Sequence, residues 1–393
     1  MNEYAVSSDT IKDWLFGQAL PLWSHAGLDS AAGGFVEALT LDHQPILDVA
    51  KRMRVQARQC FVYSYAHKLG WTPPQGDPTA LQAAAQGFDF ITRNFWNDKA
   101  GGFIFSAHRD GSPVDTRVEA YEQAFALFAS AWYYEASRDP AALDWAQRIV
   151  DWLDANLADP GHGGLRENTQ GSLPRRQNPH MHFLEALLAL YEATGDRQWL
   201  DRAAAIVALF RTRFFDKTSG TLGEFFTADW RPAPGNDGQI VEPGHHFEWV
   251  WLLHKYATLT NDDTETHAAA LYRFGEAHGR DAEPGAGAGL AFDALQRDGS
   301  MHDDRKRLWV QTEAIKAQLA RHEHAGDTQA GVNLDTLVAA LFERYLNIGG
   351  GSWYDHLDRS GRPFGDNAPA SSFYHVFLAL TEVLRVRGDL AAL

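Results

Sequence analysis

The sequence predicts an all-α protein, an (α/α)6 barrel of six helix–hairpin–helix repeats with short β-hairpins between the helices. Three observations predict it. A glycine-rich segment recurs at a spacing of about 60 residues, a pair of amphipathic helical patterns separates successive segments, and hairpin-turn sequences follow the glycines. Because no linker interrupts the period, we expect residues 1–393 to form a single domain rather than the two or three that the length would suggest.

The glycine segments mark the repeats. They begin at Gly33, Gly101, Gly163, Gly220, Gly287 and Gly349. Residues 101–114, 289–302 and 351–364 each read as a short strand, a turn and a second short strand. The pairs Asp110-Gly111 and Asp298-Gly299 are hairpin-turn signals. We therefore expect a small hairpin in each repeat.

Two helical patterns belong to each repeat, and apolar residues recur in them at steps of three and four. The first helices of the pairs are expected at residues 11–26, 81–96, 141–157, 198–215, 267–279 and 333–346. The second helices are expected at residues 58–70, 121–137, 181–196, 245–262, 309–327 and 372–389. The second set is more apolar, so we place it inside a closed ring. An open superhelical array would need polar caps at its ends, and the sequence offers none.

One polar or aromatic residue stands near the start of each expected inner helix. These residues are Arg58, Tyr121, His182, His245, Trp309 and His375. They follow their glycine segments at similar distances, so we interpret them as equivalent positions of the six repeats. In a closed ring, such positions converge at one end of the central cavity and form one pocket.

Two His-x-x-Glu pairs open inner helices, His182 with Glu185 and His245 with Glu248. Residues three apart lie on one helix face, so each carboxylate could fix the tautomer of its histidine and raise its pKa. The same pairs allow a metal hypothesis of the dinuclear carboxylate type. We expect no metal, because the guanidinium of Arg58 would oppose a bound dication. His180 and His246 are interpreted as exposed or supporting residues.

Composition excludes several classes of function. The net charge of −16 argues against nucleic acid and anionic membranes as partners. The single cysteine, Cys60, excludes an intrachain disulfide and a cysteine-rich metal site, and it fits a reducing, cytoplasmic setting. The N-terminal segment does not predict a signal peptide, and no stretch of about 18 apolar residues predicts a membrane span. Phosphate-loop and serine-elbow motifs are absent from the sequence.

The inner-helix motifs resemble the N-acylglucosamine 2-epimerase family of sugar epimerases and isomerases, most closely its bacterial mannose isomerase-type members. The segments that carry the resemblance are 56–59, 121–125, 178–186, 243–249 and 374–376. The Asn-Pro-x-Met-His and Pro-Gly-His-x-x-Glu-Trp sequences are its most specific parts. The resemblance implies an (α/α)6 barrel, in agreement with the repeat.

The resemblance also implies roles for individual residues. His245 and His375 resemble the family's acid–base pair, and Arg58 and Glu248 act beside them. The expected sugar-binding residues are Tyr121, placed by its helix position, together with Asn178, His182 and Trp309. No cofactor or metal is implied. N-acetyl-sugar epimerases often have Gln-Gly-Arg where this chain has Gln56-Ala57-Arg58, which speaks against an N-acyl substrate, and the resemblance to cellobiose 2-epimerases is weaker.

The resulting hypothesis is a cofactor-independent isomerase that interconverts mannose and fructose by histidine-mediated proton transfer through an enediolate. A neutral monosaccharide is the expected partner, and the enzyme is expected to be a monomer or homodimer. A 2-epimerase of N-acetylglucosamine/N-acetylmannosamine or glucose/mannose is the alternative, since the same residue types serve both. A glycoside hydrolase using two of Asp110, Glu248 and Glu313, or a barrel without catalytic function, are more distant alternatives.

Overall fold

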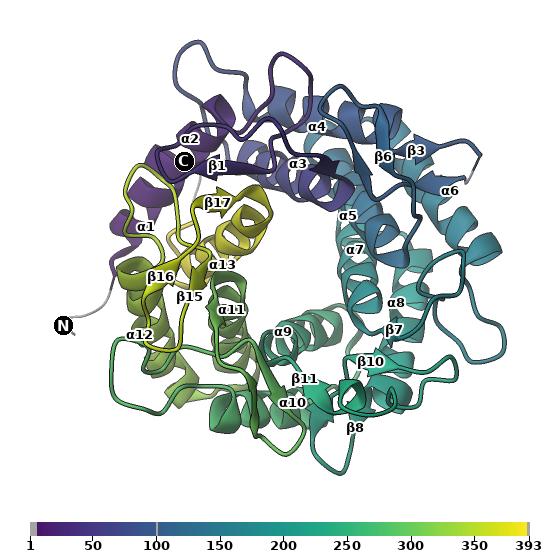
Figure 1. The fold of residues 1–393 in the computed structure, drawn as a ribbon, viewed down its shortest axis with the longest axis vertical. Coiled ribbons are helices and arrows are strands. Elements are labelled where there is room, and N and C mark those ends of the chain that lie inside the picture. Colours follow the sequence, from purple (N-terminus) through teal and green to yellow (C-terminus); the bar gives the residue numbers. More distant parts are fainter. Residues whose placement is uncertain (1–5, 100, 391–393) are drawn as a thin grey trace.

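The computed structural model describes residues 6–99 and 101–390, and within them the helices form two concentric rings around one axis (Figure 1). The inner ring consists of α3 (Met53–Lys68), α5 (Ala120–Ser137), α7 (Asn178–Thr194), α9 (Pro243–Thr260), α11 (Leu308–Ala325) and α13 (Phe373–Val386). These are the helices that the sequence analysis placed inside. Residues Pro179 to Leu190 of α7 are all buried, as expected for a helix covered on every side.

The outer ring surrounds the inner one. It consists of α1 (Ser8–Trp14) and α2 (Leu20–His25) joined by the π-helical turn η1 (Leu15–Ala19), then α4 (Ala80–Asn94), α6 (Pro140–Asn156), α8 (Arg197–Leu209) with the π-helical turn η2 (Phe210–Phe214), α10 (Glu265–His278) and α12 (Thr328–Arg344). Each outer helix precedes the glycine segment of its repeat, as predicted. The predicted (α/α)6 barrel is confirmed, whereas the single-domain organisation of residues 1–393 stays a prediction.

Short strands connect the helices at one end of the rings. They are β1 (Ala38–Thr40), β2 (Lys51–Arg52), β3 (Trp96–Asn97), β4 (Gly102–Phe103), β5 (Ser106–Ala107), β6 (Pro113–Asp115), β7 (Arg175–Arg176), β8 (Phe215–Asp216), β9 (Thr221–Leu222), β10 (Phe225–Phe226), β11 (Ile240–Val241), β12 (Ala294–Gln296), β13 (Met301–Asp303), β14 (Lys306–Arg307), β15 (His356–Leu357), β16 (Pro363–Phe364) and β17 (Asn367–Pro369). The three predicted hairpins are present as β5–β6, β12–β13 and β15–β16. The 3-10 turns η3 (Asp237–Gln239) and η4 (Ala370–Ser372) precede β11 and α13.

The strands also link neighbouring repeats. The strand that leads into an inner helix pairs with the hairpin of the next repeat, as in the sheets β2–β5–β6, β11–β12–β13 and β14–β15–β16. Strand β1 pairs antiparallel with β17, with Ala38 opposite Pro369. Because β1 belongs to the first repeat and β17 to the last, this pairing closes the ring. Figure 1 shows the two ends of the chain colour scale side by side at this closure.

A side chain from the inner helix holds the glycine segment in five of the repeats described. The backbone N–H groups of Phe35, Phe103, Leu165, Leu222 and Ala291 donate to Gln56, Gln123, His180, His246 and Gln311, at distances of 2.7 to 3.1 Å. The glycines make this approach possible. Gly34 has φ +67°, and an added Cβ would lie 2.5 Å from Gln56 Oε1.

This arrangement corrects the interpretation of His180 and His246, which are buried rather than exposed. In both, Nε2 accepts a backbone N–H, while Nδ1 faces the backbone oxygen of Arg176 or Glu242. Burial lowers the pKa of His180 to about 3 and that of His246 to about 4. Both are therefore neutral residues that hold the fold together.

None of the described helices is long and apolar enough to cross a membrane. Residues 1–5, part of the segment assessed for a signal peptide, lie outside the described residues.

Candidate active site

The eight predicted site residues meet at the first turns of the inner helices. Two series of contacts, each of four residues, join them. Arg58 Nη2 donates to the Tyr121 hydroxyl at 3.1 Å, and the Tyr121 and His182 rings lie 5.3 Å apart. His182 Nδ1 lies 3.9 Å from Glu248 Oε1. Asn178 Nδ2 lies 3.2 Å from His245 Nε2, and the Trp309 ring lies 5.2 Å from His245 and 5.6 Å from His375.

These residues are not at one equivalent position, however. Relative to the side chain that holds each glycine segment, Arg58 and His182 lie two positions later, whereas Tyr121, Asn178 and Trp309 lie two positions earlier and His245 one earlier. The residues two positions later are Arg58, Phe125, His182, Glu248 and Glu313. The site residues therefore lie in two layers, half a turn or more apart along the helices. Their spacing from the glycine segments did not distinguish the two layers.

His245 lies between two carboxylates. Its Nδ1 is 3.0 Å from Glu224 Oε2 and 3.6 Å from Glu242 Oε2. Burial lowers its pKa, but the charges of Glu224 and Glu242 outweigh burial and raise the pKa to about 9. His245 is therefore protonated at neutral pH. The predicted pairing with Glu248 is not formed, because Glu224 takes that place from the segment between β9 and β10.

Asn178 can serve both protonation states of His245. Its Nδ2 faces His245 Nε2, which suits a neutral imidazole, while its Oδ1 has no hydrogen-bond partner among the residues described. An amide can be turned to exchange these two atoms. With the oxygen facing Nε2, Asn178 accepts the second N–H of the protonated ring.

His375 has the opposite environment. Its Nδ1 donates to Glu313 Oε1 at 2.8 Å, and Glu313 Oε2 pairs with Lys316 Nζ at 2.7 Å. All three side chains are buried. Burial lowers the pKa of His375 well below its usual value, and the positive charges of Arg58 and Lys316 act in the same direction. His375 is therefore neutral, with Nε2 as its basic atom.

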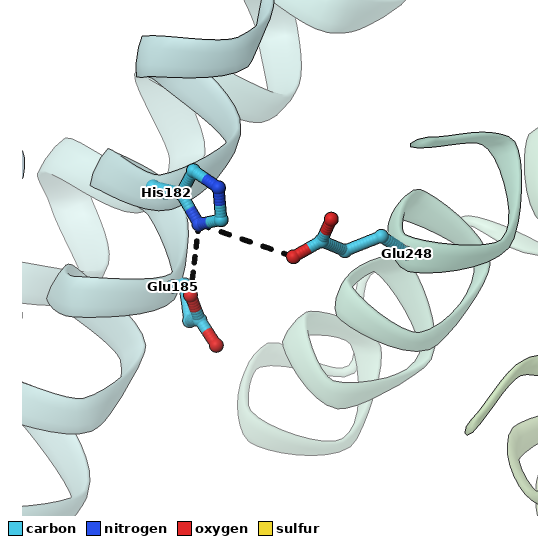
Figure 2. Close-up of side chains that lie close together, drawn as sticks. All are labelled: His182, Glu185 and Glu248. Carbon is cyan, nitrogen blue, oxygen red and sulfur yellow. Dashed lines mark hydrogen bonds and ion pairs between the residues drawn. The ribbon is translucent and has the colours of Figure 1, made fainter. Parts of the chain in front are cut away.

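His182 faces the carboxyl groups of Glu185 and Glu248, as Figure 2 shows. Its Nδ1 lies 3.1 Å from Glu185 Oε2, so the predicted contact within this His-x-x-Glu pair is present. The predicted rise in the pKa of His182 is absent, because burial lowers this pKa to about 4. Glu185 is ionised: burial raises its pKa, but His182 and the hydroxyl of Tyr374 hold it at about 2.

Glu248 is the carboxyl group that keeps its proton. Glu185, Glu248 and Glu313 share the single buried ammonium of Lys316, so one cation faces three carboxyl groups. Burial, with the charges of Glu313 and Glu185, raises the pKa of Glu248 well above its usual value. A neutral carboxylic acid can donate a hydrogen bond, as in other sites where burial holds a proton on an acid.

Arg58 supplies the positive charge that faces the histidines. Its guanidinium lies over the rings of Phe125 and Tyr374, at 4.6 and 5.3 Å, and Nη1 lies 3.4 Å from the backbone oxygen of Ser371. None of the salt bridges found among the described residues joins it to a carboxylate. Its charge is therefore available to a developing oxyanion.

Two groups of ligand atoms lie close enough together to hold a metal ion. They are His182, Glu185 and Glu248, and Glu224, Glu242 and His245. In both, the histidine atom that faces the carboxylates is Nδ1, already used in a hydrogen bond, and the charges of Lys316 and Arg58 oppose a cation at the first group. That the enzyme needs no metal or cofactor stays a prediction.

Sequence reasoning missed several residues of the site. Glu313 lies four residues after Trp309 on α11, and the sequence suggests it only as a hydrolase carboxylate. The i+3 spacing of Glu313 and Lys316 is a signal that could have been used to find it. Glu224 lies in a connecting segment without periodicity, so nothing in the sequence directs it to His245. Asp110, the other hydrolase candidate, is exposed and bonds Ser112 in the β5–β6 turn.

Residues 33–379 match the family model described as N-acylglucosamine 2-epimerase (GlcNAc 2-epimerase). The chain belongs to this family and is a sugar isomerase or 2-epimerase.

Its relatives carry both types of name. It is 36% identical to a mannose-6-phosphate isomerase of Rhizobium meliloti over 94% of this chain and 95% of the relative. It is 27% identical to a D-mannose isomerase of Thermobifida fusca over 78% of this chain and 79% of the relative. The structure of a cellobiose 2-epimerase from Bacillus thermoamylovorans matches with a TM-score of 0.85 at 22% identity, covering 96% of this chain and 98% of that one. The resemblance stated from the motifs is confirmed.

Proposed function

We propose that this enzyme is an aldose–ketose isomerase of the mannose-to-fructose type, which works by proton transfer between histidines and an open-chain sugar. The observation that carries the proposal is the opposite protonation of His245 and His375 on either side of Trp309. Two titratable groups whose environments push their pKa values apart are suited to act as acid and base.

In the proposed reaction, His375 Nε2 is the base. It removes the proton from C2 of the open-chain aldose, the electrons of the C2–H bond form a C1–C2 double bond, and the carbonyl oxygen O1 becomes negative. Arg58 stabilises this charge, and protonated His245 supplies a proton to O1. His375 then returns its proton to C1, while O2 loses a proton to His245 and becomes the ketone.

Tyr121, Asn178, His182, Glu248 and Trp309 bind the sugar in this proposal. Trp309 offers an aromatic face between the two histidines. His182 presents Nε2 as an acceptor, because its Nδ1 donates to Glu185. Glu248 offers the hydrogen of its neutral carboxyl group to a sugar hydroxyl. Donors and acceptors without net charge match a neutral polyol.

A neutral sugar is also favoured over a sugar phosphate. Three arginines lie two to four residues before site residues, and each is paired: Arg54 with Glu122 at 2.8 Å, Arg176 with Glu167 at 2.6 Å, and Arg307 with Asp293 at 2.8 Å. A phosphate would have to displace these carboxylates. Displacement would leave the buried carboxylate of each pair without its cation, which costs free energy.

The experiment that tests the proposal follows mannose in D2O by NMR. We expect fructose carrying deuterium at C1, and loss of the reaction in His375→Gln but not in Cys60→Ser, which alters a buried thiol on the same helix as Arg58. Formation of glucose deuterated at C2, or conversion of N-acetylmannosamine without fructose formation, would instead establish the 2-epimerase alternative. No turnover of any of these sugars would overturn both.

A further inference from the structure

A second cavity lies at the end of the barrel opposite the candidate active site. Its volume is about 530 Å³, within the range of small-molecule sites. All six inner helices line it, each with its second half, whereas the active site uses their first turns. Its walls include Phe61 and Tyr65 of α3, Phe128 and Trp132 of α5, and Trp251 of α9.

Buried side chains lie between this cavity and the candidate active site. Phe61 packs on Phe128 and Tyr374, with ring centroids 5.1 and 5.4 Å apart. Glu185 borders the second cavity while its carboxylate is held by His182 and Tyr374 of the active-site side. None of the eight predicted site residues lines the second cavity, so its lining is distinct from the candidate active site.

The charged groups at the second cavity are already paired with one another. Lys68 Nζ lies 2.6 Å from Glu135, Lys255 Nζ lies 2.7 Å from Glu192, and Arg385 Nη2 lies 2.6 Å from Glu323 and 2.9 Å from Glu382. A charged ligand would have to break one of these pairs. The lining has five glutamates, including Glu185, and three cations, so it offers hydrogen-bonding groups of both kinds and has no unpaired cation to attract an anion.

The aromatic wall is held in place by ring contacts. The Trp132 ring packs against Phe61 and Tyr65, with centroids 4.8 Å apart in each case. Charged and polar side chains line the same cavity. A ligand that has both an apolar face and several hydroxyl groups matches both kinds of lining group.

We propose that this cavity is a second, non-catalytic binding site for a neutral carbohydrate. The apolar C–H face of a sugar ring packs on Tyr65 and Trp132, and the sugar hydroxyls bond the paired charges at the rim. Small residues, Ala131, Ala189, Ala193 and Ala320, leave room for the ring. The proposal does not depend on which reaction the active site performs.

The test uses methyl α-D-mannopyranoside, a glycoside that cannot open to the aldehyde, and measures saturation transfer to the sugar by NMR. The variants are Trp132→Ala, which removes the aromatic platform, and Ala189→Trp, which fills the cavity without removing any group. His375→Ala alters the active site alone. We expect binding to persist in His375→Ala and to weaken about tenfold or more in Trp132→Ala and Ala189→Trp.

Thermal unfolding of each variant shows whether it is folded, and Ala189→Trp decides the question if Trp132→Ala does not fold. Undiminished binding in a folded Ala189→Trp variant would overturn the proposal, as would the absence of saturation transfer in the wild type. Tetramethylammonium and decanoate are compared with the glycoside. Binding of either one in place of the glycoside would overturn the assignment to neutral carbohydrate. None of these results depends on turnover, so failure of the isomerase test would leave them unchanged.

Discussion

The Nδ1 atom of His375 lies 2.8 Å from Oε1 of Glu313, and both side chains are buried. The carboxylate accepts the Nδ1 hydrogen and so leaves Nε2 as the basic atom of the ring. This arrangement resembles the hydrogen-bonded carboxylate and imidazole of other acid–base sites, where the carboxylate fixes the tautomer. It makes Glu313 a positioning residue that acts through His375.

Glu313→Gln is expected to lower kcat by about 10³-fold with little change in KM, because the amide keeps the shape but neither fixes the tautomer nor balances charge on the ring. The measurement is steady-state isomerisation of mannose. Glu323→Gln is the matched control, since Glu323 lies on the same helix but at the opposite end of the barrel. Equal activity of Glu313→Gln and the control would contradict the role given to Glu313.

Lys316→Met is expected to move the acidic limb of kcat/KM to higher pH. Burial already raises the pKa of Glu313, and Lys316 opposes that rise, so its removal lets Glu313 keep a proton to higher pH. We also expect the free energy of unfolding to fall by about 3 kcal/mol, because a buried carboxylate loses its partner. Lys316→Arg should restore part of the free energy of unfolding and part of the pH position of the acidic limb. An unshifted pH profile in a folded Lys316→Met variant would contradict the effect of Lys316 on Glu313.

The alkaline limb of kcat/KM is expected near pH 9, where His245 loses its proton. Because the pKa of His245 is raised in the folded state, its contribution to stability is complete below about pH 6.5 and is lost as pH rises to about 9. Glu224→Gln removes the charge that contributes most to the rise and should move the alkaline limb to lower pH. If the alkaline limb of Glu224→Gln lies at the same pH as in the wild type, His245 is not the acid.

His180→Gln is expected to preserve stability, whereas His180→Leu should lower the free energy of unfolding by about 1–3 kcal/mol. Three other repeats already use glutamine at the corresponding place, where Gln56, Gln123 and Gln311 accept from the glycine segment. Leucine leaves the N–H of Leu165 without its acceptor. Urea unfolding measures both variants, and equal stability of the two would contradict the supporting role of His180.

The sequence could predict much of this molecule because the fold repeats. Helix periodicity, the glycine segments and the hairpin turns are local signals; the first two are present in all six repeats and the hairpin pattern in three. The position of an inner helix start could therefore be predicted without knowing the tertiary structure. Arg58, His245 and His375 were found in this way and through the family motifs, and the structure brings them together.

The parts that could not be predicted are those that depend on contacts across repeats. The two-layer arrangement of the site arises because some site residues precede the side chain that holds the glycine segment and others follow it, so a similar spacing from the glycines does not mean equal height in the barrel. The packing of Gly244 is another contact across repeats: a Cβ there would lie 2.5 Å from the Trp309 ring of the next inner helix. No local pattern on α9 indicates that constraint.

Periodicity and short motifs are enough to predict the barrel, the family and the set of residues at the starts of the inner helices. The charge of each histidine depends instead on contacts that form when the chain folds. His245 and His375 are chemically identical side chains, and their pKa values move in opposite directions because one lies between Glu224 and Glu242 while the other is buried beside Arg58 and Lys316. Electrostatic interactions act across space between residues far apart in the chain, so the assignment of acid and base required the fold.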